Sequence, residues 1–343
     1  MSDALLNTLV DAVADLVTAV SDCDEELLDP DTAEQWLEHV GALLDRLSPA
    51  DRATLSTRLR QSAARRPAGG RRDAVLRIPE EFGLDDDQHE LYCDGLEYLG
   101  RRLVKTVRDV DPATPLPTRP GQSVADLVLR HGATHRWARR LIQGRASGEV
   151  PPERPGHPAG YPDWLARSAA DTLAALRAAD PETPVWTPGA DQRVRYYARR
   201  LLLATVIALA DAELALGQEP RVPAGTGADG IEEFFENLSH DPRRAARLSA
   251  LTPAPLRLAA TDTGAAWTVT PQPGGRPRWT GRAPVGTTAR VSVEGSGGDL
   301  LLLLYGRFRP EAPRFQVRGE RALLEEWLAA TAYEGDADPE PPG

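Results

Sequence analysis

Two histidines four residues apart have the types and spacing to hold a metal ion. His131 and His135 lie in the stretch VLRHGATH. Side chains at positions i and i+4 share one face of a helix, so both imidazoles could reach one ion. Asp211, on a later helix, offers a carboxylate oxygen as a third ligand. Three protein ligands with one open position are typical of catalytic zinc.

A structural interpretation competes with this metal site. In it, His131 is a hydrogen-bonded core residue and His135 lies at the rim. The remaining candidates are weaker. Gly225-Thr226-Gly227 follows no strand, which excludes a dinucleotide-binding loop. Ser296-Gly297-Gly298 is predicted to cap a helix rather than to bind an anion.

The charge of the chain restricts its partners. The chain has 343 residues, 41% of them hydrophobic, and a net charge of −11. An acidic chain repels phosphate backbones, so no nucleic-acid partner is expected. An arginine-rich stretch is interpreted as a solvated helix end and loop because acidic residues flank it. Its members are Arg58, Arg60, Arg65, Arg66, Arg71 and Arg72.

Several features predict a cytoplasmic protein without a membrane partner. Cys23 and Cys93 lie far apart and form no disulfide framework, which fits a reducing compartment. The first residues, MSDALLNTLVDAVADLV, lack the basic start of a signal peptide. The longest nearly apolar run, Leu201 to Ala210, is shorter than the roughly 20 residues that span a bilayer. It is predicted to be a buried core helix.

Residues 1–85 are predicted to form a helical module. Apolar residues recur at helical spacing over 5–17, and capping signals start further helices near Asp31 and Ser48. The Gly-, Pro- and Arg-rich stretch 64–73 is predicted to be a loop. We expect this module to contact a protein partner.

Residues 86–221 are predicted to form a four-helix bundle. Long helical patterns alternate with loops that contain Pro and Gly, and four amphipathic helices of this length pack naturally together. The predicted helices cover residues 87–108, 123–144, 161–179 and 191–216.

Residues 222–334 have the pattern of a small α+β domain. Four β-like runs are joined by an apolar helix after Ser296 and a last helix over 320–332. The predicted strands cover residues 256–260, 266–270, 289–294 and 315–319. The acidic, Pro-rich tail 335–343 is predicted to be disordered. The fold class is therefore α+β multidomain.

Four stretches together resemble one known family. They read LPTRPGQSVADLVLRHGATHRW (116–137), RYYARRLLLATVIALADAELALG (195–217), ADGIEEF (228–234) and SVEGSGGDLLLLLYGR (292–307). They resemble the mycothiol-dependent maleylpyruvate isomerase family. That resemblance implies a DinB-like four-helix bundle followed by an α+β domain similar to sterol carrier proteins. It covers about residues 87–333 and leaves the first module outside.

The resemblance also implies a metal site that this chain has lost in part. Family members hold a divalent metal, usually zinc, with one His on the second bundle helix and a Glu and a His on the last. The matching positions here are His131, Ala204 and Ala208. We therefore expect no cofactor; zinc and mycothiol remain only if His135 and Asp211 act as replacement ligands.

The sequence favours a family member without catalytic activity, acting as a binding or partner protein. A small-molecule ligand is expected in the cleft between the bundle and the C-terminal domain. The alternative is a mycothiol- or metal-dependent isomerase or transferase acting on a small organic acid or natural-product intermediate. Arg199 and Arg200 are predicted to be solvent-exposed. Asp229 and Glu233 are predicted to begin a linking helix and to complement its dipole.

Overall fold

In the computed structural model the chain divides into two compact units, Met1–Gln88 and His89–Gly343. The division lies close to the boundary expected after residue 85. The structure describes residues 3–23, 27–44, 47, 49–84, 88–152, 160–238, 240–272, 277–280 and 289–332. The predicted tail, residues 335–343, lies outside these ranges.

The first unit is helical throughout its described residues. Its helices are α1 (Asp3–Ser21), α2 (Pro30–Leu44), α3 (Pro49–Ala64) and α4 (Gly70–Glu81). One face of α1 packs into a small core with α3 and α4. The buried residues of this core are Val10, Ala14, Val17, Leu59, Ala63, Val75, Ile78 and Leu84.

The prediction of a loop over residues 64–73 is wrong for its second half. Helix α4 already begins at Gly70, because Gly69 turns the chain at a φ of 146° that favours glycine and its carbonyl accepts the amide of Arg72. The arginines near this turn are also less solvated than expected. Arg65 and Arg66 form ion pairs with Asp11 and Asp15 of α1. Carboxylates of the same unit therefore compensate part of the positive charge of this stretch.

Helix α1 is the one described helix that is long and apolar enough to cross a membrane by length and composition. Core helices of water-soluble proteins and signal sequences meet the same criteria. Its carboxylates Asp3, Asp11 and Asp15 form ion pairs with arginines of α3, of α4 and of the turn between them.

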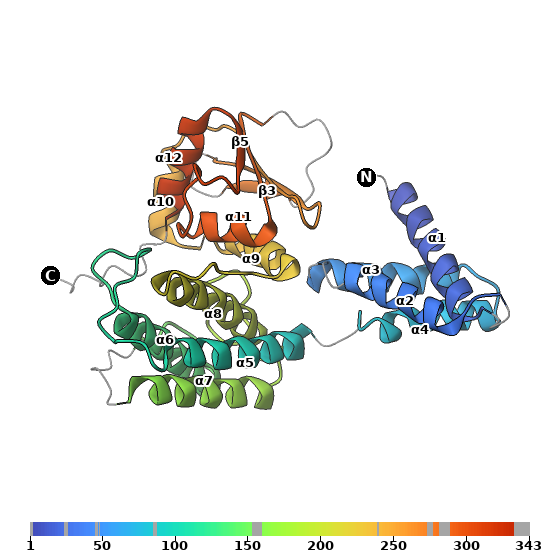
Figure 1. The fold of residues 1–343 in the computed structure, drawn as a ribbon, viewed down its shortest axis with the longest axis horizontal. Helices are drawn as coiled ribbons and strands as arrows, with labels where there is room; N and C mark the ends of the chain where they lie inside the picture. Colours follow the sequence, from blue (N-terminus) through green and yellow to red (C-terminus); the bar gives the residue numbers. More distant parts are fainter. Residues whose placement is uncertain are drawn as a thin grey trace. The chain divides into compact units, whose positions relative to one another are not determined.

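Four helices form the bundle of the second unit (Figure 1). They are α5 (Gln88–Val107), α6 (Val124–Gly144), α7 (Tyr161–Ala178) and α8 (Arg195–Ala215). A capping box between Ser123 and Asp126 starts α6. Helix α8 buries 15 of its 21 residues, which is why its sequence is apolar on nearly all sides.

A glycine beside His131 sets the approach of α6 to α7. A Cβ atom at Gly132 would overlap the ring of Trp164 on α7. The indole therefore fills the space that a larger residue at 132 would need. The backbone of His135 is also fixed to α7, since the hydroxyl of Thr172 donates a hydrogen bond of 2.9 Å to its carbonyl.

The C-terminal part of the second unit is a five-stranded sheet with helices, as the α+β prediction requires. The sheet order is β3-β2-β1-β4-β5, with β1 and β4 parallel and the other pairs antiparallel. The strands are β1 (Leu256–Ala260), β2 (Ala266–Thr270), β3 (Arg278–Thr280), β4 (Val291–Gly295) and β5 (Gln316–Gly319). Strand β3 was not predicted from the sequence, because it has only three residues.

Four helices accompany the sheet: α9 (Ala224–Leu238), α10 (Pro242–Ser249), α11 (Gly297–Leu304) and α12 (Arg321–Thr331). Helix α9 lies between α8 and α11 (Figure 1). The leucines Leu300–Leu304 are all buried in the core that α9, α11 and the sheet share. They act as core residues.

Helix α9 begins earlier than the acidic residues that were expected to start it. Asp229 and Glu233 lie inside the helix and are buried. Three glycines obscured its start in the sequence, because glycine disfavours helix. A Cβ at Gly227 would overlap the backbone of Gly297 and Gly298 in α11. The glycine is thus required by close helix packing.

Candidate functional site

The two histidines of the predicted metal site lie together in the bundle interior. His131 Nε2 lies 3.1 Å from Thr205 Oγ1 of α8 and 3.3 Å from His135 Nε2. The rings meet edge to face. His131 is buried, as the structural interpretation expected. His135 is completely buried, so its placement at the rim was wrong.

Burial keeps both imidazoles neutral. Removal from water lowers the pKa of His135 to about 4. Burial, followed by the charges of His135 and Arg130, lowers the pKa of His131 well below its ordinary value. Neutral imidazole is the form that binds a metal, but here the facing nitrogens hydrogen-bond to each other and to a hydroxyl.

The two alanines of α8 occupy the positions where further ligands were expected. Ala208 is 5% exposed and packs among the apolar residues of α5 and α6. Ala204 is half-buried. Between them, Thr205 donates a 2.7 Å hydrogen bond to the carbonyl of Leu201. This turn of α8 therefore presents methyl groups and one hydroxyl that is already engaged.

Asp211 is committed to arginines. Its carboxylate accepts bonds from Arg307 at 2.7 and 2.8 Å, from Thr118 at 2.7 Å and from Arg119 at 3.2 Å. Burial by itself would raise the pKa of Asp211, but the hydrogen bonds and charge of Arg307, with Thr118 and Arg119, hold it below its usual value. We call Thr118, Arg119, Asp211 and Arg307 the Asp211 cluster.

The Asp211 cluster joins the bundle to the C-terminal domain and has a surplus of positive charge nearby. Arg307 follows α11, whereas Asp211 belongs to α8. A third guanidinium, that of Arg130, donates to Gln122 at 2.5 Å. Burial, and then the charge of Arg119, lowers the pKa of Arg130 to about 10. Arg119 and Arg307 thus bind the buried carboxylate of Asp211, and Arg130 lies near it with Asp126 as a second negative charge.

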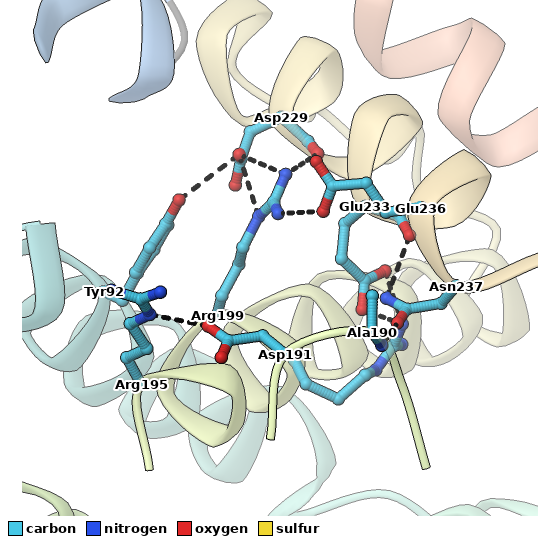
Figure 2. A network of polar contacts seen from close by, with 10 residues as sticks. Tyr92, Ala190, Asp191, Arg195, Arg199, Asp229, Glu233, Glu236 and Asn237 are labelled. Atoms are coloured by element: carbon cyan, nitrogen blue, oxygen red, sulfur yellow. Dashed lines mark hydrogen bonds and ion pairs between the residues drawn. The ribbon is translucent and has the colours of Figure 1, made fainter. Parts of the chain in front are cut away.

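A second polar cluster holds α8 against α9 (Figure 2). Arg199 contacts the Asp229 carboxylate at 2.9 and 3.0 Å and Glu236 at 2.6 Å. Tyr92 of α5 donates to the same Asp229 oxygen at 3.3 Å. We call Tyr92, Arg199, Asp229 and Glu236 the Arg199 cluster.

The exposure predicted for Arg199 and Arg200 is therefore wrong. Both side chains are 20% exposed, and Arg200 pairs with buried Glu233 at 2.7 Å. Their charges are compensated by α9, whose helical register places Asp229 and Glu233 one turn apart on one face. Burial raises the pKa of Asp229 and that of Tyr92.

The predicted helix cap at Ser296 is confirmed. The Ser296 hydroxyl accepts a hydrogen bond of 3.1 Å from the backbone amide of Asp299. The carboxylate of Asp262 accepts the first free amide, that of Gly297, at 3.0 Å. A protein carboxylate thus occupies the place where an external anion would bind.

An open depression in the second unit is lined by none of these histidines. It measures about 900 Å³ and is lined by α5 and the end of α8. Its lining residues include Tyr98, Arg101, Arg102, Glu213 and Leu216. Its walls carry charges of both signs.

The residues present do not fit a zinc ion. Among the described residues, no group of three or more His, Cys, Asp or Glu side chains is placed to hold a metal. The structure brings His131 and His135 together. The carboxylate of Asp211 forms ion pairs with Arg307 and Arg119 instead. The sequence analysis assigned no role to Arg119 or Arg307, because residues so far from Asp211 in the chain give no local signal of a contact with it.

Residues 98–213 match the mycothiol maleylpyruvate isomerase N-terminal domain, and residues 227–326 match the MDMPI C-terminal domain. No curated protein matches. One similar solved structure is the stereoselective inverting sec-alkylsulfatase Pisa1 from Pseudomonas sp., with 14% identity and a TM-score of 0.26. The match covers 80% of this chain and 41% of that one, and a TM-score this low supports no argument.

The two matched domains follow each other along the chain in the same order as the bundle and the α+β domain described above. Their boundary falls in the segment between α8 and α9. The chain belongs to the mycothiol maleylpyruvate isomerase family.

Proposed function

We propose that this protein is a non-catalytic member of its family that acts by binding. The observation that carries the proposal is the hydrogen bond between His131 and Thr205, on a helical turn whose ligand positions are Ala204 and Ala208. One imidazole held by a hydroxyl and a second imidazole leaves too few donors for a catalytic zinc. Without the metal, the thiol of mycothiol would lack the group that activates it.

Restoring the missing ligands tests the proposal. The double variant Ala204→Glu/Ala208→His should bind one zinc ion, because both new ligands share a face of α8 with His131 across from them. A matched control, Ala204→Gln/Ala208→Asn, adds similar volume without a carboxylate or an imidazole. Zinc binding is measured by calorimetry and isomerisation of maleylpyruvate by absorbance, each with mycothiol present.

Two results would contradict the proposal. One is mycothiol-dependent isomerisation by the unaltered protein. The other is a fall in that activity when His131 is replaced by Asn. Zinc binding by the restored variant alone, with an inactive wild type, supports the proposal.

The ligand that we propose is a small organic anion at the Asp211 cluster. Arg119, Arg130 and Arg307 lie at or near this buried carboxylate, and guanidinium groups bind carboxylates through paired hydrogen bonds. Fumarate and maleate serve as probes in equilibrium titration. Binding of neither probe at millimolar concentration would remove this part of the proposal.

The same arginines favour the second candidate function, an isomerase or transferase that acts on a small organic acid through an altered site. Turnover separates the two candidates, since a binding protein retains the probe unchanged. We further propose that the protein works in the cytoplasm and that its first unit, Met1–Gln88, contacts a protein partner.

A further inference from the structure

The first unit exposes an unusual share of apolar side chains. Within the described residues, eight of the ten exposed large hydrophobic side chains belong to Met1–Gln88. That unit has about a quarter of the chain. Exposed apolar groups concentrated in one place mark an interaction surface more often than single ones do.

Four of these side chains form one stripe along α1. They are Leu5, Leu9, Val13 and Leu16, which are 50%, 48%, 44% and 66% exposed. Spacings of four, four and three residues keep them within about 80° of one another around the helix axis. The buried face of α1, with Val10, Ala14 and Val17, points elsewhere. Helix α1 is thus apolar both toward its core and toward solvent.

The stripe carries no charge. The acidic residues of α1 lie on the other half of the helix, and Arg58 of α3 and Arg65 and Arg66, which follow α3, form ion pairs with them inside the unit. Helix α1 has no Lys or Arg. A surface that binds the stripe therefore needs no complementary charge.

We propose that a second copy of this chain covers the stripe, with two α1 helices antiparallel about a two-fold axis. The spacing is nearly symmetric about the middle of the stripe. In an antiparallel pair Leu5 therefore meets Leu16 of the other copy, and Leu9 meets Val13. A self-complementary face is what a two-fold interface requires. Antiparallel packing also brings opposite helix dipole ends together.

A membrane surface suits this helix less well. Interfacial helices combine an apolar face with a polar face rich in Lys and Arg, which anionic lipids attract. The polar face of α1 carries Asp3, Asp11 and Asp15 instead. Anionic lipid headgroups would repel these carboxylates.

The size of the stripe sets the expected strength. A helix of 19 residues is about 28 Å long, and four part-exposed side chains fall short of the roughly 800 Å² that each partner gives to a standard interface. We therefore expect a dimer that dissociates in the micromolar range. This inference names the partner that the proposed function assigns to the first unit, and it does not depend on the state of the metal site.

Sedimentation velocity of the full chain between about 1 and 200 µM tests the proposal. The wild type should shift from monomer to dimer with concentration. Leu9→Glu/Leu16→Glu places charge on the stripe and should weaken association at least tenfold. Ala4→Glu/Thr57→Glu adds the same charge at exposed positions off the stripe and should associate like the wild type. Circular dichroism checks that both variants keep their helices.

A cross-link tests the arrangement without disturbing the apolar residues. Ala12 is exposed near the middle of the stripe. In a Cys23→Ser background, Ala12→Cys should form a disulfide-linked dimer on mild oxidation, and Ala4→Cys should form much less. A wild type that stays monomeric at 200 µM would overturn the proposal. So would equal dimerisation of the stripe and control variants, or binding of a monomer to phosphatidylcholine–phosphatidylglycerol vesicles.

Discussion

At the scale of single residues, the chain matches both family domains, and we propose that its metal-binding chemistry is altered. Thr205 and Ala208 are buried, so this turn of α8 forms part of the core. The imidazole of His131 hydrogen-bonds to Thr205 there. The resemblance places two of the family's metal ligands at Ala204 and Ala208, and the loss of a metal there stays a prediction. The sequence did not predict that His135 would be fully buried, because i,i+4 spacing fixes a shared face but not its depth.

The buried histidines make stability depend on pH. Their pKa values are lowered in the folded state, so they stay neutral there while the unfolded chain takes up protons below about pH 6.5. Stability is therefore full above that pH and is lost as the pH falls toward about 4. His135 alone should contribute a loss of about 2 kcal/mol at pH 5.

Urea unfolding at pH 7 and pH 5 measures this effect. His135→Gln should reduce the difference between the two pH values, whatever its stability at pH 7. His39→Gln, at an exposed position of α2, is the control and should leave the difference as in the wild type. An undiminished difference in His135→Gln would show that other groups cause the pH dependence.

At the scale of elements, the helix α9 shows what the sequence could not reveal. The sequence predicted that the helix begins at its acidic residues, because glycines interrupt the helical pattern before and between them. The structure shows a helix from Ala224, because Gly227 lets α11 approach and Arg199 and Arg200 receive the acidic residues. Such contacts join residues distant in sequence, so local pattern cannot predict them. The bundle helices, which are long and separated by loops that contain Pro and Gly, were predictable.

The close packing of α9 on α11 predicts a sharp effect of one methyl group. Gly227→Ala should destabilise the protein by about 1–3 kcal/mol, because the new Cβ would overlap backbone that cannot rotate away. Urea unfolding measures the change. Gly100→Ala in α5, where a Cβ meets nothing within 4 Å, is the control and should stabilise by up to about 1 kcal/mol. A neutral Gly227→Ala would show that the two helices lie further apart.

At the scale of the whole molecule, the chain consists of a helical unit and a larger unit that contains both family domains. The change near residue 85 from a small helical module to the longer helical patterns of the bundle was visible in the sequence. The polar clusters that join the bundle to the α+β domain were not, since Asp211 and Arg307 are far apart in the chain.

The two units should fold independently. Removal of residues 1–85 should leave a soluble fragment with its own cooperative thermal transition, because the core of the second unit contains no residue of the first. Calorimetry of the fragment and of the full chain compares the transitions. An insoluble fragment, or one that melts without cooperativity, would contradict this division.

We propose above all that the metal site of the family no longer holds a metal in this chain. The most direct test is the zinc content of the purified, untagged protein after incubation with zinc and gentle desalting. The account predicts a ratio of zinc to protein near zero, equal to that of the His131→Asn variant. A ratio near one in the wild type that falls in His131→Asn would contradict it, and would restore His135 and Asp211 as ligands to test.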